Sequence, residues 1–108
     1  MKVSNMTSTN GNAIPNQFII TEKGNGANGN FIKKEVFQSY QSVICERIIW
    51  DPKDCEGFRA NSIDITLDRN KWDYSTTTGK YRNQFLRETK KETERKIASG
   101  EYILADLN

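Results

Sequence analysis

The side chains best suited to chemistry in this sequence are basic and polar, and they recur with a helical spacing after position 75. If one helix begins near Ser75 and continues past Leu86, four of them fall at spacings of four, three and four residues and form one stripe. The stripe consists of Lys80, Gln84, Arg87 and Lys91. Cations in such a row can follow a phosphate backbone, so the pattern indicates nucleic-acid contact. The alternative is an ordinary solvated helical face.

The charge of the chain supports this interpretation because it is unevenly distributed. The net charge is +2, yet residues 69–96 hold nine Lys or Arg against four Asp or Glu. A local excess of this kind attracts phosphates, nucleic acid or an acidic protein surface. The basic candidates for binding a nucleic acid or a partner are Lys80, Arg82, Arg87, Lys90, Lys91 and Arg95.

Aromatic residues near this window add a second kind of contact. Trp72, Tyr74 and Tyr40, if exposed, offer rings on which unpaired bases stack. The alternative is that these rings belong to the core, and only their exposure distinguishes the two cases.

Catalytic and metal chemistry find little support in the sequence. The chain has no histidine and two cysteines, Cys45 and Cys55, without CxxC spacing. It therefore lacks the commonest general base and zinc ligand, and we expect no enzyme, no cofactor and no metal site. The thiols are expected to be structural or incidental.

Two further patterns resemble ligand sites and fail on inspection. Thr76–Lys80 ends like a phosphate-binding loop, but the motif requires a glycine where Tyr74 stands and a Ser or Thr where Tyr81 stands. Asp64, Asp68 and Asp73 could in principle gather around a divalent cation. We expect Asp64 and Asp68 instead on the solvent face of a strand.

The strand signals predict a small curled antiparallel sheet of three to four strands. The clearest is the alternation of Ile63, Ile65 and Leu67 with polar residues. Residues 18–21 favour a short strand, and 35–50 a long one with a bend or bulge. Residues 1–13 are rich in Asn, Ser and Thr and are expected to be a flexible segment before a single domain over 14–108.

One or two C-terminal helices are expected to cover this sheet. Ser75 suits an N-cap, and Thr78, Tyr81 and Phe85 then fall on one face toward the sheet. A second start signal is the capping box formed by Thr89 with Glu92. Its helix is expected to run to about Ser99 and to stop at Gly100. The fold class is therefore α+β.

Three segments give the chain a resemblance to a known group of proteins. They are Asn16–Phe18, Phe37–Tyr40 and the block Trp72–Leu86. The chain resembles a family of small uncharacterised proteins seen mostly in tailed-phage genomes, over residues ~14 to 106. The resemblance implies a phage origin and an α+β fold, and it carries no activity. The loop 51–61 and the glycine-rich loop near residue 26 look like expansions of the family pattern.

Two functions of different classes follow as expectations. The first is a phage-type accessory protein that associates with nucleic acid through a basic C-terminal helical face. The second is a non-enzymatic modulator or inhibitor that binds a host enzyme or defence complex. No apolar run reaches the length of a membrane span and no secretory signal is visible, so we expect a cytoplasmic protein without membrane contact. The oligomeric state is open.

Overall fold

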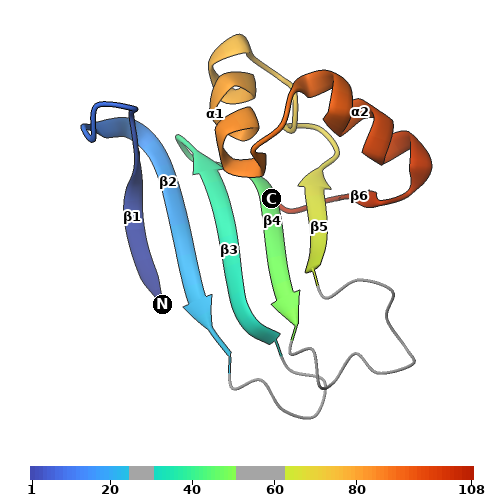
Figure 1. Cartoon of the computed structure of the whole chain (residues 1–108), viewed down its shortest axis with the longest axis horizontal. Helices are drawn as coiled ribbons and strands as arrows, with labels where there is room; N and C mark the ends of the chain where they lie inside the picture. Colours follow the sequence, from blue (N-terminus) through green and yellow to red (C-terminus); the bar gives the residue numbers. More distant parts are fainter. Residues whose placement is uncertain (25–30, 51–62) are drawn as a thin grey trace.

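The structure is a computed structural model that describes residues 1–24, 31–50 and 63–108. One six-stranded sheet, with its strands in sequence order, carries two helices over one face (Figure 1). The elements are β1 (Lys2–Thr7), β2 (Ala13–Lys23), β3 (Phe31–Ser39), β4 (Ser42–Trp50), β5 (Ile63–Asp68), α1 (Thr76–Leu86), α2 (Lys90–Ser99) and β6 (Tyr102–Ala105).

The predicted α+β class is confirmed, but the sheet is larger than expected and is mixed. The four pairings from β1 to β5 are antiparallel, whereas β6 runs parallel to β5. Parallel neighbours require a crossover connection, and α1 with α2 supplies it between β5 and β6. The helices thus cover the sheet and also return the chain to its edge.

The first additional strand lies where we expected a loosely held segment. Within residues 1–13, Lys2–Thr7 pairs with β2, with Val3 opposite Ile20. The side chain of Asn5 also donates to the Ile14 carbonyl, at 2.9 Å. An edge strand needs backbone pairing more than its own β propensity, so a polar composition did not exclude it.

The second additional strand arises because the single long strand predicted over 35–50 is a hairpin. β3 and β4 pair with Ser39 opposite Ser42, which leaves a two-residue turn at Tyr40 and Gln41. Tyr40 has the left-handed φ of 56°, unusual for an aromatic residue. Its N–H donates to the Asn16 carbonyl at 2.7 Å. Sequence propensity missed the turn because no Gly, Asn or Pro marks it.

The helix signals are confirmed, and they form two helices. The Ser75 side chain accepts from the N–H of Thr78, and the Thr89 side chain accepts from the N–H of Glu92. Gly100 ends α2 with a φ of 85°. Arg87, at φ 58°, ends α1 and turns the chain before α2 begins.

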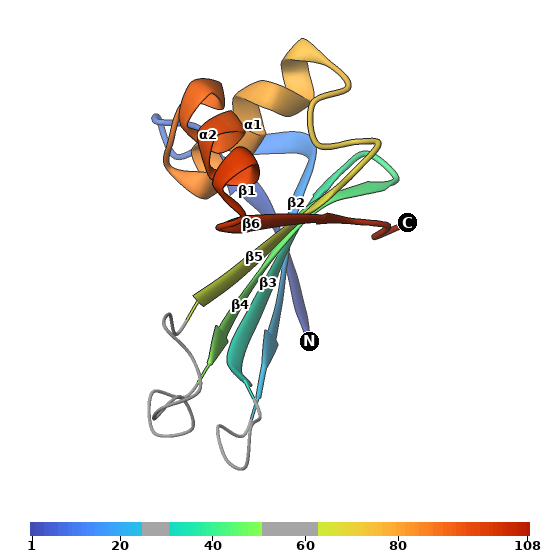
Figure 2. The same ribbon diagram turned by 90° about the vertical axis from the view of Figure 1, so that its right-hand side faces the viewer.

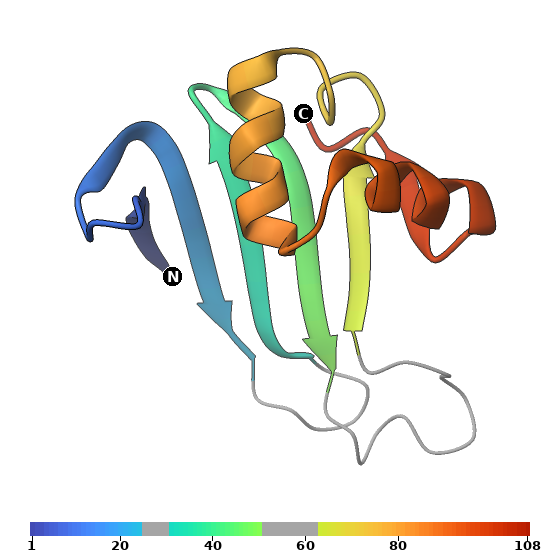
Figure 3. The ribbon, with the colours of Figure 1, turned by 45° about the horizontal axis from the view of Figure 1, so that its top comes forward.

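The core lies between the helices and one row of the sheet. Ile19, Phe37, Cys45 and Leu67 are partners along that row. Phe85 of α1 stacks on Phe37 with ring centroids 5.9 Å apart. Figures 2 and 3 show both helices on this side of the sheet.

The expected docking of the two helical rings is confirmed. Phe85 is buried in the core, and Tyr81 packs against it while partly exposed. Helix α1 contacts β3 and β4, so the two rings lie over these strands. They do not cover the far end of β5, where Ile63 is 45% exposed.

Cys45 is buried and free, and burial raises the pKa of its thiol, as suits a structural cysteine. Cys55, the loop 51–61 and most of the glycine-rich loop lie outside the described residues. Neither α1 nor α2, the helices of the described ranges, has the length and apolarity of a membrane span.

A polar network around Glu88 fastens α2 to β6. The carboxylate accepts from the Thr93 hydroxyl at 2.6 Å, the Tyr102 hydroxyl at 2.7 Å and Lys96 Nζ at 2.8 Å. Burial by itself raises the pKa of Glu88, but these donors hold it below the ordinary value. Burial and the neighbouring carboxylate raise the pKa of Tyr102 to about 12. Near neutral pH the ionised Glu88 carboxylate and the protonated Tyr102 hydroxyl therefore both favour the folded arrangement.

Replacing Glu88→Gln is expected to lower the free energy of unfolding by about 1–3 kcal/mol at neutral pH, because charged hydrogen bonds are lost in a buried position. The folded pKa lies below the unfolded value of about 4.5. The contribution of Glu88 is thus present above that pH and is lost as the pH falls through the folded pKa. Urea unfolding across the acid range measures both effects. Glu94→Gln, on the exposed side of α2, is the control.

Candidate nucleic-acid interface

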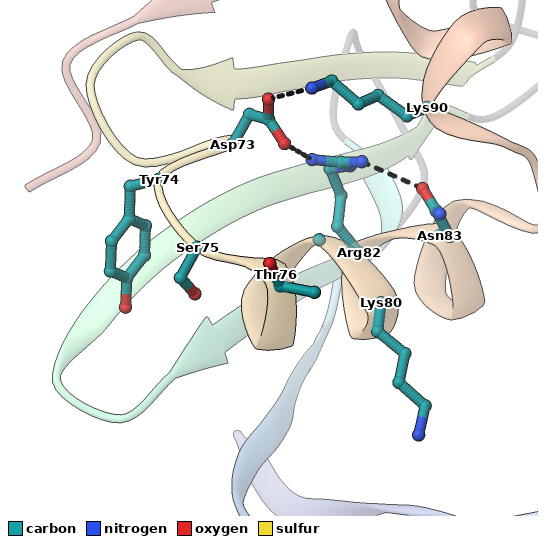
Figure 4. A pocket seen from close by; sticks show the side chains of 9 residues that line it. Asp73, Tyr74, Ser75, Thr76, Lys80, Arg82, Asn83 and Lys90 are labelled. Atoms are coloured by element: carbon teal, nitrogen blue, oxygen red, sulfur yellow. Dashed lines mark hydrogen bonds and ion pairs between the residues drawn. The ribbon is translucent and has the colours of Figure 1, made fainter.

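A pocket of about 790 Å³ surrounds the first turns of α1 and the segment before it. Its lining combines three cationic side chains, one carboxylate, hydroxyls and one aromatic ring. The lining residues are Asp73, Tyr74, Ser75, Thr76, Gly79, Lys80, Arg82, Asn83 and Lys90 (Figure 4).

The segment before α1 is held in place by Asp68 at the end of β5. Its carboxylate accepts from the N–H of Asn70 at 3.1 Å and of Leu107 at 2.8 Å, and its carbonyl accepts from the N–H of Trp72 at 3.0 Å. Burial raises the pKa of Asp68, but these donors bring it below the ordinary value. Asp68 is therefore buried, and the expectation that it faces solvent was wrong, because the chain after β5 folds back onto it.

Arg82 is a structural residue, which corrects its assignment to a binding surface. Its side chain is only 1% exposed. Nη1 donates to the Trp72 carbonyl at 2.7 Å and to Asp73 at 3.0 Å, and Nη2 donates to Asn83 at 3.0 Å. The guanidinium also lies 5.2 Å from the Trp72 ring centroid. Helical periodicity turns this position inward, beneath the segment before the helix.

Lys90 is also engaged, although it is exposed. Its Nζ lies 2.6 Å from the second oxygen of Asp73. Burial raises the pKa of Asp73, but the hydrogen bonds from Lys90 and Arg82 more than offset this and lower it. The same contact raises the pKa of Lys90. Lys90 and Arg82 together carry two positive charges against the one negative charge of Asp73, so this wall of the pocket has a net positive charge.

Lys80 and the start of α1 supply the unengaged donors. Lys80 is exposed and makes no ion pair with any residue of the described ranges; its Nζ lies 5.4 Å from the Tyr81 ring centroid. The first turn of α1 contains no acidic residue. The N–H groups of Thr76 and Thr77 have no helical acceptor and carry the positive end of the helix dipole. An anion is favoured here.

Two of the three predicted aromatic candidates are exposed, and one of them, Tyr74, lines this pocket. Tyr74 is 46% exposed and Tyr40 is 53% exposed. The Ser39 and Thr78 hydroxyls share a hydrogen bond of 3.2 Å, which joins the β3–β4 turn to the first turn of α1. The turn and the start of α1 consequently lie at the same end of the molecule (Figures 1 and 3). Trp72 instead packs against the core beneath Arg82.

The predicted stripe of four residues does not form, and the basic candidates do not share one helical face. Arg87 leaves the helical conformation, so the chain turns between Gln84 and Lys91. Gln84 donates to the Thr7 carbonyl at 2.9 Å, and Arg87 lines a smaller pocket of about 260 Å³ nearby. Lys91 is exposed on α2.

Arg95 lies on α2 and pairs with Glu101 at 3.6 Å. Of the predicted residues, the structure gathers Lys80, Lys90, Tyr74 and Arg82 around one pocket.

Sequence reasoning missed other contributors to this site. Lys71 Nζ lies 5.1 Å from the Tyr74 ring centroid, an interaction worth about 0.5–1 kcal/mol at an exposed site. Thr76 lines the pocket directly after the Ser75 cap. In the sequence, the three-residue spacing of Lys71 and Tyr74 was only a weak indication of this contact. Thr76 had a stronger one, because the residue after an N-cap presents a free N–H.

The carboxylates once considered for a metal have separate roles. Asp64 accepts from Trp50 Nε1 at 2.7 Å, whereas Asp68 and Asp73 hold the donors given above. Within the described ranges, no three acidic or Cys side chains gather as metal ligands.

Comparisons with known proteins found no match among family models, curated proteins or solved structures.

Arg82→Met should lower the free energy of unfolding by about 3 kcal/mol, because it removes a buried charge from three partners and leaves Asp73 with Lys90 alone. Chemical denaturation measures this loss. Lys80→Met, two positions away and exposed, is the matched control and should change stability by less than about 0.5 kcal/mol. Equal effects of the two substitutions would contradict a structural role for Arg82.

Proposed function

We propose that this protein binds single-stranded nucleic acid at the pocket around the start of α1. The observation that supports this most is the exposed Tyr74 ring, with Lys71 against it, beside the first N–H groups of α1 and Lys80, which has no ion pair within the described ranges. A ring and a phosphate site at this proximity match the alternation of base and phosphate along an unpaired strand.

Each group has a distinct part in the proposed contact. Figure 4 shows Tyr74 and Lys80 pointing away from the Asp73–Arg82 pair, on either side of Thr76. A phosphate placed at Thr76 accepts from the helical N–H groups and pairs with Lys80. The neighbouring base stacks on Tyr74, and Tyr40 at the joined hairpin turn offers a second platform. A duplex would hide the faces of its bases, so the exposed rings favour single strands.

The number of available cations limits the affinity and its dependence on salt. Lys71 and Lys80 make no ion pair with a residue of the described ranges, and Lys90 is shared with Asp73. Two to three neutralised phosphates correspond to a slope of roughly −1.4 to −2.1 in log K against log salt for single strands. Binding is thus modest, and these slopes correspond to a loss of affinity of roughly seven- to twentyfold between about 50 and about 200 mM salt.

This activity suits an accessory protein in the host cytoplasm if the chain has the phage origin that the resemblance implies, and it involves binding without catalysis. The alternative is a protein-binding modulator of a host enzyme or defence complex. The observation in its favour is an apolar face of the sheet, on the side opposite the helices, whose middle no element of the described ranges covers.

Fluorescence anisotropy with a labelled oligonucleotide of about 12 nucleotides, at about 50 mM salt, tests the proposal. Tyr74→Ala should weaken binding by about five- to tenfold or more, since a stacked base contributes about 1–3 kcal/mol. Tyr74→Phe keeps the ring and should bind nearly as the wild type does. Lys80→Ala should weaken binding several-fold and reduce the salt slope by about 0.7, the share of one phosphate on a single strand.

The matched control is Lys23→Ala, which removes the same charge at the exposed end of β2, away from α1 (Figure 1). It should leave affinity unchanged. The absence of binding at this salt concentration, or equal losses for Lys23→Ala and Lys80→Ala, would refute the proposed site.

A further inference from the structure

The face of the sheet opposite the helices carries a continuous row of side chains across all six strands. Backbone pairing runs from Val3 on β1 to Ile103 on β6. The row consists of Val3, Ile20, Val36, Glu46, Thr66 and Ile103. Successive residues of a strand face opposite sides, so this row lies behind the buried row that contains Phe37 and Leu67.

Apolar side chains on this face stay in contact with solvent. Val3 is 57% exposed and Ile103 is 60% exposed. Phe18, Ile20, Val36 and Ile48 are partly exposed, and none of them packs against the core cluster. Figure 2 shows the helices on one side of the sheet, with the C-terminal end of the chain on the other.

The described C-terminal residues cover only one end of the face. Asn108 exchanges two hydrogen bonds with Val43, of 2.8 and 2.9 Å, near the start of β4. Leu107 donates to Asp68 at the end of β5. The middle of the face, around Ile20, Val36 and Ile48, is covered by no element of the described ranges.

The size of the face matches that of a stable protein interface. Six strands at about 4.8 Å spacing, with a typical length of about 25 Å, give a projected area of roughly 700 Å². Standard interfaces bury about 800 Å² on each partner, which is close to the projected area of this whole face.

The charged pair near the centre of this face, Lys34 and Glu46, is self-complementary under a twofold rotation. Lys34 on β3 and Glu46 on β4 lie side by side on this face, with Nζ and Oε2 3.6 Å apart. A twofold axis that lies in the plane of the face and passes between them brings each Lys34 opposite the Glu46 of a second copy. Ile20 and Val36 lie on one side of this pair and Ile48 on the other, so the same rotation sets apolar side chains on apolar side chains.

We propose that this face is the interface with a second copy of the chain, and that the protein is a twofold symmetric dimer of two sheets packed face to face. The Lys34 and Glu46 side chains form two reciprocal ion pairs at its centre, and Ile20, Val36 and Ile48 form its apolar part. The pocket at the start of α1 lies on the helical side, so dimerisation leaves both pockets accessible and does not depend on nucleic-acid binding.

Charge exchange between two variants tests this pairing. The Lys34→Glu chain carries acidic residues at positions 34 and 46, and the Glu46→Lys chain carries lysines at both. Each alone should dimerise at least about tenfold more weakly than the wild type, because like charges then meet at the centre. An equimolar mixture should form a one-to-one heterodimer, because both ion pairs reform across the interface. Light scattering after gel filtration and native mass spectrometry give the masses.

The wild type should have a mass of about twice 12.4 kDa. Lys33→Glu is the matched control, because the neighbouring residue points to the helical side; mixed with Glu46→Lys it should give no preferred heterodimer. Circular dichroism verifies that each variant folds. If a charge reversal prevents folding, the neutral variants Lys34→Gln and Glu46→Gln replace the two charge-reversal variants, and each should dimerise more weakly than the wild type. A monomeric wild type at every concentration, or a mixture that stays monomeric, would overturn the proposal and assign the face to another partner or to none.

Discussion

The buried guanidinium of Arg82 is the contact on which the candidate site depends. It joins α1 to the Trp72 carbonyl and Asp73, and Asp73 in turn joins Lys90 at the start of α2. Without this link, the Asp68 contacts and the packing of Trp72 would hold the beginning of the segment before α1, but not Tyr74, which is exposed. One arginine thereby keeps the pocket wall positive while contributing no free donor to its surface.

The two faces of the sheet have different roles for a physical reason. Two short helices have enough apolar surface to cover one face, and the Phe85–Phe37 stack with Arg47 4.3 Å from the Phe85 ring centroid fixes them there. The other face carries solvent-exposed apolar residues beside the Lys34–Glu46 pair, and no element of the described ranges covers its middle. The polar-lined pocket thus lies at the helical end, and apolar surface remains on the opposite side.

The candidate site was predictable in part. The charge excess and the ring at position 74 drew attention to the segment that lines the pocket, and the Ser75 cap located the start of α1. The inward direction of Arg82 and the pairing of Lys90 with Asp73 were not visible, because both depend on residues that the fold brings beneath the helix. The stripe failed at Arg87, where a left-handed residue without the usual glycine ended α1.

By itself the sequence determined the local elements: the caps at Ser75 and Thr89, the stop at Gly100 and the alternation that buries Leu67. These follow from contacts within one turn or one strand, so a few neighbouring residues are sufficient. Only the tertiary structure decided that Lys2–Thr7 joins the sheet, that β6 runs parallel to β5, and which cations stay free. Those outcomes depend on backbone pairing and charge compensation between segments far apart in the chain, for which no local pattern exists.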